Sequence, residues 1–199
     1  MNLPNKLTIL RIVLTPIFML VLLWNFPFHD LVALIIFIGA SVTDLLDGKI
    51  ARKRGLVTDF GKFLDPLADK MLTTAAFLGF LARGIGIGIV WIVFIVLFRE
   101  FMVSSVRLIA STSGGKVIAA NIWGKLKTVF QMIAVIFTLT ACQALEILSL
   151  LDIFPATLVV ISQILWYAVS ILLWISAILC VVSGVIYLID NKDFIKQTK

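Results

Sequence analysis

Two short stretches decide how this chain folds: DLLDGKIAR at residues 44–52 and, after eight more residues, GKFLDPLAD at residues 61–69. Four of the eleven acidic residues of the chain lie in them. At 100° per residue, Asp44 and Asp47 share one helix face with the small residues Gly48 and Ala51. Asp65 and Asp69 share one stripe of a second helix in the same way. The basic segment 53–59 predicts a chain reversal that brings the two helix faces together.

Four carboxylates gathered in this way repel one another. A pair at about 4 Å costs on the order of 4 kcal/mol at an effective dielectric constant near 20, so the cluster requires protons or divalent cations. Ligands that are all oxygen favour a hard ion, Mg²⁺ or Mn²⁺. The alternative is that the aspartates are solvated helix ends or pair with Arg52, Lys62 and Lys70; for Asp59 this alternative is the better interpretation.

The composition places the remainder of the chain in lipid. Hydrophobic residues make up 61% of the 199 residues and charged residues 14%, a balance that favours an all-α integral membrane protein. About 20 residues cross the hydrocarbon layer, which allows six transmembrane helices in a single domain, residues 1–199. Apolar stretches fall at about 7–28, 31–48, 63–82, 85–110, 126–151 and 157–189. The last is longer than one crossing requires, so its start after Pro155 is expected to lie along the interface.

The distribution of lysine and arginine predicts the orientation of the spans. Basic residues gather near the N-terminus, at 49–70, at 107–127 and at 192–199, whereas the loops near His29, Arg83 and Glu146 contain one basic residue. By the positive-inside rule, both termini and the aspartate cluster are cytoplasmic in a multi-pass protein of the cell membrane. The net charge of +6 therefore faces anionic headgroups and phosphorylated substrates, and nucleic acid is not an expected partner. Cys142 and Cys180 lie within apolar runs and are interpreted as packing residues.

The two aspartate stretches closely resemble the signature of the CDP-alcohol phosphatidyltransferase family. That signature reads D-x-x-D-G-x-x-A-R, eight residues, then G-x-x-x-D-x-x-x-D, and every specified position is filled here between residues 44 and 69. The resemblance implies a six-helix fold, usually a homodimer, in which CDP-diacylglycerol and a hydroxyl acceptor meet at a site with two metal ions. The resemblance therefore implies a transferase of phospholipid synthesis.

The resemblance also implies roles for individual residues. Asp44, Asp47, Asp65 and Asp69 resemble the metal ligands, and Asp69 resembles the catalytic general base as well. The positions that resemble contacts to CDP-diacylglycerol are Asn5, Thr8, Gly48, Ala51, Arg52 and Thr58. For Asn5 and Thr8 a simple helix start is the alternative interpretation.

The identity of the acceptor depends on the second half of the chain. Arg99 and Glu100 interrupt an apolar run. Charged residues within membrane segments are rare and usually have a functional role. Together with Arg107, Lys125 and Lys127, Arg99 predicts a basic pocket for an acceptor that carries its own phosphate. The alternatives are an internal Arg99–Glu100 pair that orders the helices and lysines that anchor the cytoplasmic side.

The pattern of these residues resembles the branch of the family that uses glycerol 3-phosphate. The expected reaction gives phosphatidylglycerophosphate and CMP, a step in phospholipid biosynthesis. One alternative is the same chemistry with another acceptor, inositol phosphate or phosphatidylglycerol. A remote alternative is a divalent-cation transporter, which would carry its carboxylates near the middle of the membrane on discontinuous helices.

Overall fold

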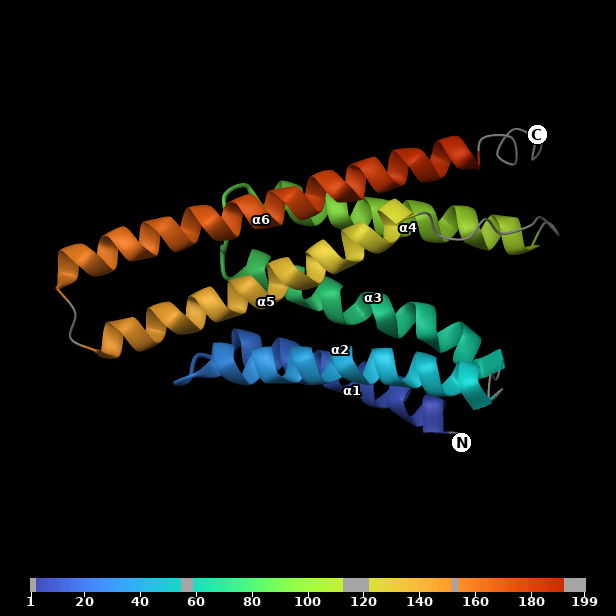
Figure 1. Ribbon diagram of the computed structural model, residues 1–199, viewed down its shortest axis with the longest axis horizontal. Helices are drawn as coiled ribbons and strands as arrows, with labels where there is room; N and C mark the ends of the chain where they lie inside the picture. Colours follow the sequence, from blue (N-terminus) through green and yellow to red (C-terminus); the bar gives the residue numbers. More distant parts are fainter. Residues whose placement is uncertain (1–2, 55–58, 113–121, 152–153, 192–199) are drawn as a thin grey trace. The chain divides into compact units, whose positions relative to one another are not determined.

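The part of the chain that the structure describes forms six helices (Figure 1). The computed structural model describes the backbone of residues 3–54, 59–112, 122–151 and 154–191, and the side chains of residues 6–43, 68, 70–109, 122–151 and 154–191. No strand occurs within these backbone ranges. The helices are α1 (Leu3–Leu23), α2 (His29–Arg54), α3 (Asp59–Ala82), α4 (Ile89–Thr112), α5 (Ile122–Leu150) and α6 (Pro155–Asp190).

The apolar character of the helices fits a multi-pass membrane protein. Over the residues with described side chains, α1, α4, α5 and α6 contain segments long and apolar enough to cross a membrane, by length and composition. Shorter apolar segments occur at His29–Thr43 of α2 and Lys70–Ala82 of α3. Large apolar side chains such as Leu20, Ile35 and Phe98 are largely exposed, as expected for surfaces that face lipid. The prediction of an all-α membrane protein is confirmed, and six spans stay a prediction.

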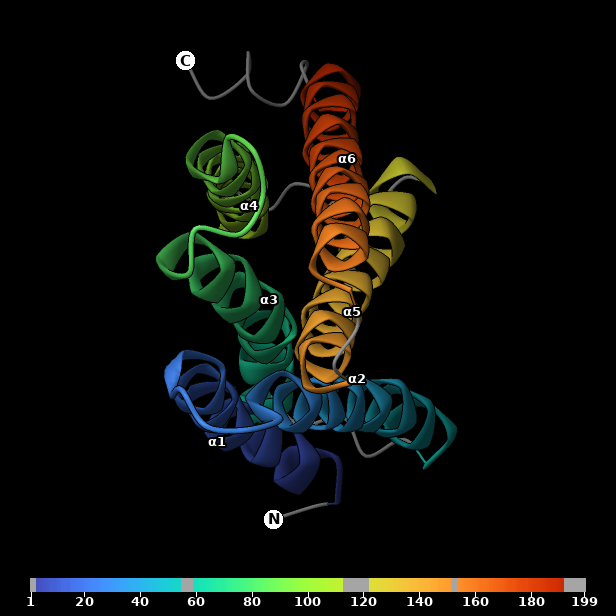
Figure 2. The same cartoon turned by 90° about the vertical axis from the view of Figure 1, so that its left-hand side faces the viewer.

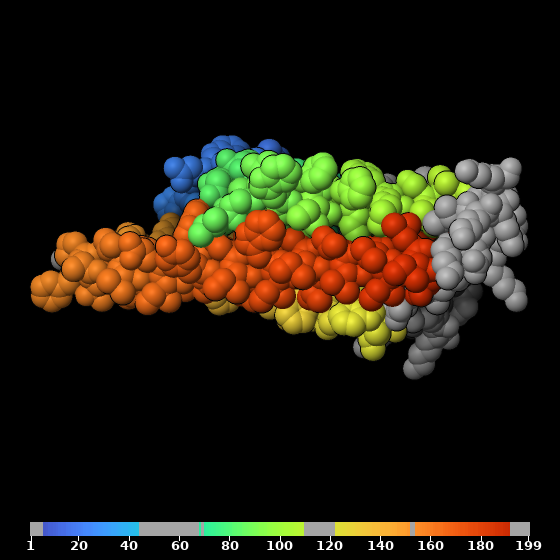
Figure 3. Space-filling model, turned by 90° about the horizontal axis from the view of Figure 1, so that it is seen from above, coloured from blue at the N-terminus to red at the C-terminus, as the bar shows by residue number. Residues whose placement is uncertain are grey.

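The predicted apolar stretches have the same order along the chain as the helices, but their first and last residues differ from the helix ends. The first ran to residue 28, but α1 ends at Leu23 because Asn25 and Pro27 follow and interrupt the helix. The predicted interfacial position of the residues after Pro155 stays a prediction. Helix α6 continues from Pro155 to Asp190 without a break, as the orange-to-red column in Figure 3 shows.

Residues 1–85 and 135–166 form one compact unit, called here the N-terminal unit. Within it α1 contacts both α2 and α3, and α2 also contacts α3; Figure 2 shows these three helices together. Phe18 of α1 packs against Phe37 of α2, with ring centroids 5.8 Å apart. Gly79 of α3 faces Leu22 of α1 so closely that an added Cβ would lie 2.3 Å from Leu22 Cδ2. This glycine therefore allows α1 and α3 to approach.

Side chains from α5 hold the start of α2 in the same unit. The backbone N–H of Phe28 donates to Glu146 Oε1 at 2.9 Å, and that of Leu31 donates to Gln143 Oε1 at 2.8 Å. Phe28 has a φ of 62°, a left-handed conformation that costs a non-glycine residue about 1–2 kcal/mol. The first N–H groups of a helix have no partner inside the helix. Two of the donors at this turn are satisfied by α5 instead.

An ion pair joins the beginning of α2 to the end of α3. Both terminal guanidinium nitrogens of Arg83, the residue after α3, donate to the carboxylate of Asp30. Nη2 donates to Oδ2 at 3.0 Å, and Nη1 donates to Oδ1. Asp30 is 2% exposed, and His29 Nε2 lies 3.6 Å from its Oδ2. Desolvation lowers the pKa of Arg83, but the hydrogen bond and the charge of Asp30 outweigh it and raise that pKa above its ordinary value. The arginine therefore stays charged.

Residues 86–134 and 167–199 form the second compact unit, the C-terminal unit. At the start of α4, Gly86 and Gly88 adopt φ values of 99° and 69°, which glycine reaches without strain. Ile87 between them donates its N–H to Ser170 Oγ at 3.0 Å and accepts at its carbonyl oxygen from Trp174 Nε1 at 2.9 Å. Two residues of α6 thereby fix the turn that leads into α4.

Candidate active site

The four predicted metal-binding aspartates lie on two helices of the N-terminal unit. Asp44 and Asp47 fall one turn apart in α2, and Asp65 and Asp69 fall one turn apart in α3. Both segments are helical as predicted, so each pair lies on one helix face. Their side chains lie outside the described residues. The backbone therefore shows which helix face carries each pair.

The axial positions of the aspartates match across the two helices. Helices α2 and α3 follow one another and run in opposite directions (Figure 1). Asp44 precedes the last residue of α2 by ten residues, and Asp69 follows the first residue of α3 by ten. Asp47 precedes that end by seven residues, and Asp65 follows that start by six. At a rise of about 1.5 Å per residue, the two pairs lie at matching distances, about 10 Å and about 15 Å, from the adjoining ends of their own helices, and these positions are called here the two aspartate levels.

This arrangement suits a pair of divalent cations. Four carboxylates at two levels of neighbouring helices supply only oxygen donors, the type that Mg²⁺ and Mn²⁺ prefer. Among the side chains that the structure describes, no group of three or more His, Cys, Asp or Glu residues is arranged to hold a metal ion. The fit between the site and the ions therefore rests on the helical positions of the four aspartates.

Helix α1 brings a second predicted group of residues to the same unit. Thr8 is fully buried in α1, the helix that contacts both α2 and α3. The side chains of Asn5, Gly48, Ala51 and Arg52 are outside the described residues, and Thr58 is outside the described backbone as well. The structure thus places the helices that carry these residues, except for Thr58.

Arg11 is a candidate that the sequence analysis missed. It follows Thr8 by one turn of α1 and is 2% exposed, which makes it one of the largest fully buried side chains. In the sequence it is one of two basic residues near the N-terminus, with Lys6. The available signal was its place four residues inside an apolar run, where an arginine is costly without an anionic partner.

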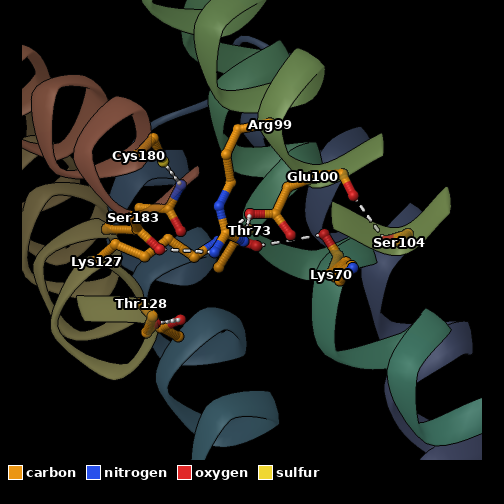
Figure 4. A network of polar contacts seen from close by, with 11 residues as sticks. Lys70, Thr73, Arg99, Glu100, Ser104, Lys127, Thr128, Cys180 and Ser183 are labelled. Carbon is orange, nitrogen blue, oxygen red and sulfur yellow. Dashed lines mark hydrogen bonds and ion pairs between the residues drawn. The ribbon is translucent and has the colours of Figure 1, made fainter. Parts of the chain in front are cut away.

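A polar network in the C-terminal unit includes two of the four predicted acceptor-binding residues (Figure 4). Glu100 Oε1 accepts hydrogen bonds from Arg99 Nη1, at 3.1 Å, and from Lys127 Nζ of α5. Arg99 Nη2 donates to Ser183 Oγ of α6 at 2.7 Å. Arg99 is 8% exposed and Lys127 5% exposed. One carboxylate therefore holds two buried cations from α4 and α5, with α6 as a third attachment.

The other two predicted acceptor residues have different surroundings. Arg107 of α4 and Lys125 of α5 are exposed, whereas Arg99 and Lys127 are buried. Gly184 of α6 packs against the Arg99 side chain, since an added Cβ would lie 3.2 Å from Arg99 Cγ. The internal Arg99–Glu100 pair, which was the alternative interpretation, is present in the structure. The pocket for a phosphorylated acceptor stays a prediction.

The fold is that of a helical protein with several membrane-spanning candidates, and its helices α2 and α3 carry two pairs of aspartates. Residues 1–182 match the sequence profile of the CDP-alcohol phosphatidyltransferase family. The chain belongs to that family, as the signature between residues 44 and 69 predicted. Members of the family are generally metal-dependent.

Three relatives illustrate the similarity. The chain is 39% identical to the CDP-diacylglycerol–glycerol-3-phosphate 3-phosphatidyltransferase of Bacillus subtilis over 209 aligned positions, which cover 99% of this chain and 98% of the relative. It is 34% identical to the protein of the same name from Rickettsia bellii over 186 positions, covering 94% and 93%. It is 41% identical to a probable phosphatidylglycerophosphate synthase of Mycobacterium tuberculosis over 137 positions, covering 67% and 64%.

Proposed function

We propose that the protein transfers the phosphatidyl group of CDP-diacylglycerol to glycerol 3-phosphate, giving phosphatidylglycerophosphate and CMP. The observation that carries this proposal is the similarity, along almost the whole of both chains, to a relative named for that reaction. The two matched levels of aspartates on α2 and α3 are consistent with the same chemistry. Inositol phosphate and phosphatidylglycerol are the competing acceptors.

In this proposal, Asp44, Asp47, Asp65 and Asp69 hold two Mg²⁺ or Mn²⁺ ions. When bound, such ions would supply positive charge that offsets the negative charge of the pyrophosphate oxygens. The chain itself binds and orients the nucleotide. The residues proposed for this task are Asn5, Thr8, Gly48, Ala51, Arg52 and Thr58, with buried Arg11 added from the structure. Small residues at 48 and 51 allow the nucleotide to approach α2.

The proton transfer falls to Asp69. Its carboxylate accepts the proton of the glycerol 3-phosphate hydroxyl, whose oxygen then attacks the lipid-linked phosphorus. A new oxygen–phosphorus bond forms, and the bond from that phosphorus to the bridging oxygen breaks. CMP leaves with the electron pair. The second half of the chain recognises the acceptor phosphate through Arg99, Arg107, Lys125 and Lys127.

The membrane arrangement is also part of the proposal. Six spans with both termini in the cytoplasm place the aspartates at the cytoplasmic face, where a water-soluble acceptor enters while acyl chains stay in lipid. The pairing of Arg83 with Asp30 supports this orientation, because the one basic residue among the three loops assigned to the outer side is neutralised. The chain is proposed to act as one domain, residues 1–199, and as a homodimer.

Cysteine labelling tests the orientation. With Cys142 and Cys180 replaced by serine, Asn25→Cys should react with an impermeant maleimide in intact cells. Lys6→Cys should react only after the cells are opened. The reverse pattern would contradict the proposed orientation.

The experiment that tests the reaction is an acceptor panel. Purified protein, CDP-diacylglycerol and Mg²⁺ or Mn²⁺ are combined with glycerol 3-phosphate, inositol phosphate or phosphatidylglycerol in turn, and CMP release is measured. We expect release with glycerol 3-phosphate; release only with another acceptor would replace the acceptor assignment. No release with any acceptor, together with metal uptake into proteoliposomes, would favour the transporter alternative.

A conservative variant tests the proposed base. Asp69→Asn keeps the size of the side chain but removes the proton acceptor, so CMP release should fall by at least about a hundredfold. Asp59→Asn, at the first position of the same helix and outside the signature, is the matched control and should keep its activity. Substantial turnover by the Asp69→Asn protein would remove Asp69 from the role of base.

A further inference from the structure

The Asp30–Arg83 ion pair lies the same number of residues from the aspartates on α2 as on α3. Asp44 follows Asp30 by fourteen residues along α2, and Arg83 follows Asp69 by fourteen residues along α3 and the residue after it. At about 1.5 Å per residue, each interval is about 21 Å. Because the two helices run in opposite directions, a contact that sets Asp30 level with Arg83 also sets Asp44 level with Asp69.

The connection between the helices does not fix this level by itself. Arg54 and Asp59 bound it, and five Cα steps reach at most about 17 Å. Packed helices lie about 8–10 Å apart, so the remaining reach allows axial sliding by more than one turn of about 5.4 Å. A slide of one turn would move Asp44 away from Asp69 by that distance. The contact at the opposite end removes this freedom.

The ion pair is well built for that task. Two parallel N–H···O contacts between Arg83 and Asp30 restrict orientation as well as distance. Asp30 is almost fully buried, and Glu146 and Gln143 of α5 hold the same turn of α2. Neither interval of fourteen residues contains a proline, so both helices can transmit the level without a kink.

From this relation, and on the basis of the proposed function, we infer that Asp30 and Arg83 are positioning residues. Their ion pair sets the axial register of α2 against α3, and so aligns Asp44 and Asp47 with Asp69 and Asp65 for divalent cations about 21 Å away. The pair touches neither substrate nor metal. Its effect should appear in metal affinity rather than in stability alone.

Mn²⁺ binding to the full-length protein tests the inference. Free Mn²⁺ is measured by electron paramagnetic resonance with saturating CDP-diacylglycerol and no acceptor, well below the unfolding temperature of each variant. Arg83→Met and Asp30→Asn should each weaken Mn²⁺ binding roughly three- to tenfold. The charge-swapped protein, with Asp30→Arg and Arg83→Asp together, should recover at least half of that loss on a logarithmic scale.

Glu146→Gln is the matched control. It removes one negative charge from the same end of the N-terminal unit, keeps an oxygen for the Phe28 N–H, and loses only the acceptor of Gln143 Nε2. Because the contacts between Asp30 and Arg83 stay intact, Mn²⁺ affinity should stay within twofold of the unmodified protein. Should Arg83→Met fail to fold, Arg83→Lys keeps the charge, loses the second contact, and should show an intermediate affinity.

Two results would overturn the inference: lower unfolding temperatures with unchanged Mn²⁺ affinity in the Asp30 and Arg83 variants, or an equal loss of affinity in Glu146→Gln. Failure of the proposed function has a different signature. In that case the unmodified protein itself would bind no Mn²⁺ or would release no CMP with glycerol 3-phosphate. Measurements on the variants therefore test the inference about register, whereas measurements on the unmodified protein test the proposed function.

Discussion

Replacing Glu100 tests how the buried charges of the C-terminal unit are balanced. Glu100→Gln keeps the shape of the side chain and removes the negative charge that Arg99 and Lys127 share. The Arg99–Glu100 contact at 3.1 Å is worth about 5 kcal/mol before desolvation, at an effective dielectric constant near 20. Removal of one member of a buried pair costs about 3–5 kcal/mol after desolvation is counted. We expect a loss of about 3 kcal/mol.

Thermal unfolding in detergent measures this loss. For a chain of this length about 1 kcal/mol shifts the midpoint by about 2–4 °C, so Glu100→Gln should unfold about 6–12 °C lower. Glu146→Gln changes the charge equally, but the Glu146 carboxylate accepts only neutral donors, the Phe28 N–H and the Gln143 amide, so its shift should stay below about 4 °C.

A double-mutant cycle separates pairing from general disruption. Lys127→Met removes one of the two cations, so Glu100→Gln with Lys127→Met should cost about 2 kcal/mol less than the sum of the single changes. Costs that add to within about 0.5 kcal/mol would show that Glu100 and Lys127 do not stabilise each other. The interpretation of Glu100 as a shared counter-charge would then be wrong.

Three further outcomes are expected. Gly79→Ala should destabilise the protein by about 1–3 kcal/mol in thermal unfolding, because its Cβ would collide with Leu22, whereas Gly39→Ala, with open space around it, should be neutral or slightly stabilising. Gly88→Ala should lower the unfolding midpoint by several degrees, since φ is 69° and the added Cβ would lie 3.2 Å from Trp174 Cζ2. Exhaustive chelation should abolish CMP release, and Mg²⁺ or Mn²⁺ should restore it; activity that survives chelation would contradict the proposed metal chemistry.

The sequence was sufficient for those features of the fold that depend on local pattern. Apolar runs separated by polar residues predicted the order of six helices, and the spacing of four aspartates predicted both helix faces and the family. Helix ends were less accurate where hydropathy and helix propensity disagree. Helix α2 continues to Arg54 through a charged segment because lysine and arginine are good helix formers although they are poor membrane residues.

Contacts between distant residues were beyond the sequence for a physical reason. Asp30 and Arg83 are separated by 53 positions, and periodicity gives the face of a helix but not its axial register against a neighbour. Each residue alone looked like an ordinary loop charge. Arg11 was similarly counted only as a topology signal, whereas the fold buries it in the helix that contacts both aspartate-bearing helices.

The polar contacts of this protein also follow from the solvent in which it folds. Lipid solvates exposed apolar side chains. Burial of leucine or phenylalanine between two helices therefore contributes little free energy that favours one packing position over another. The packing position must instead be determined by the shapes of the helix surfaces and by directional hydrogen bonds. Gly79 provides the shape between α1 and α3, and the contacts of Asp30 and Glu146 provide the direction at the start of α2. A hydropathy profile registers neither property, which is why it predicts the helices of such a protein better than their alignment.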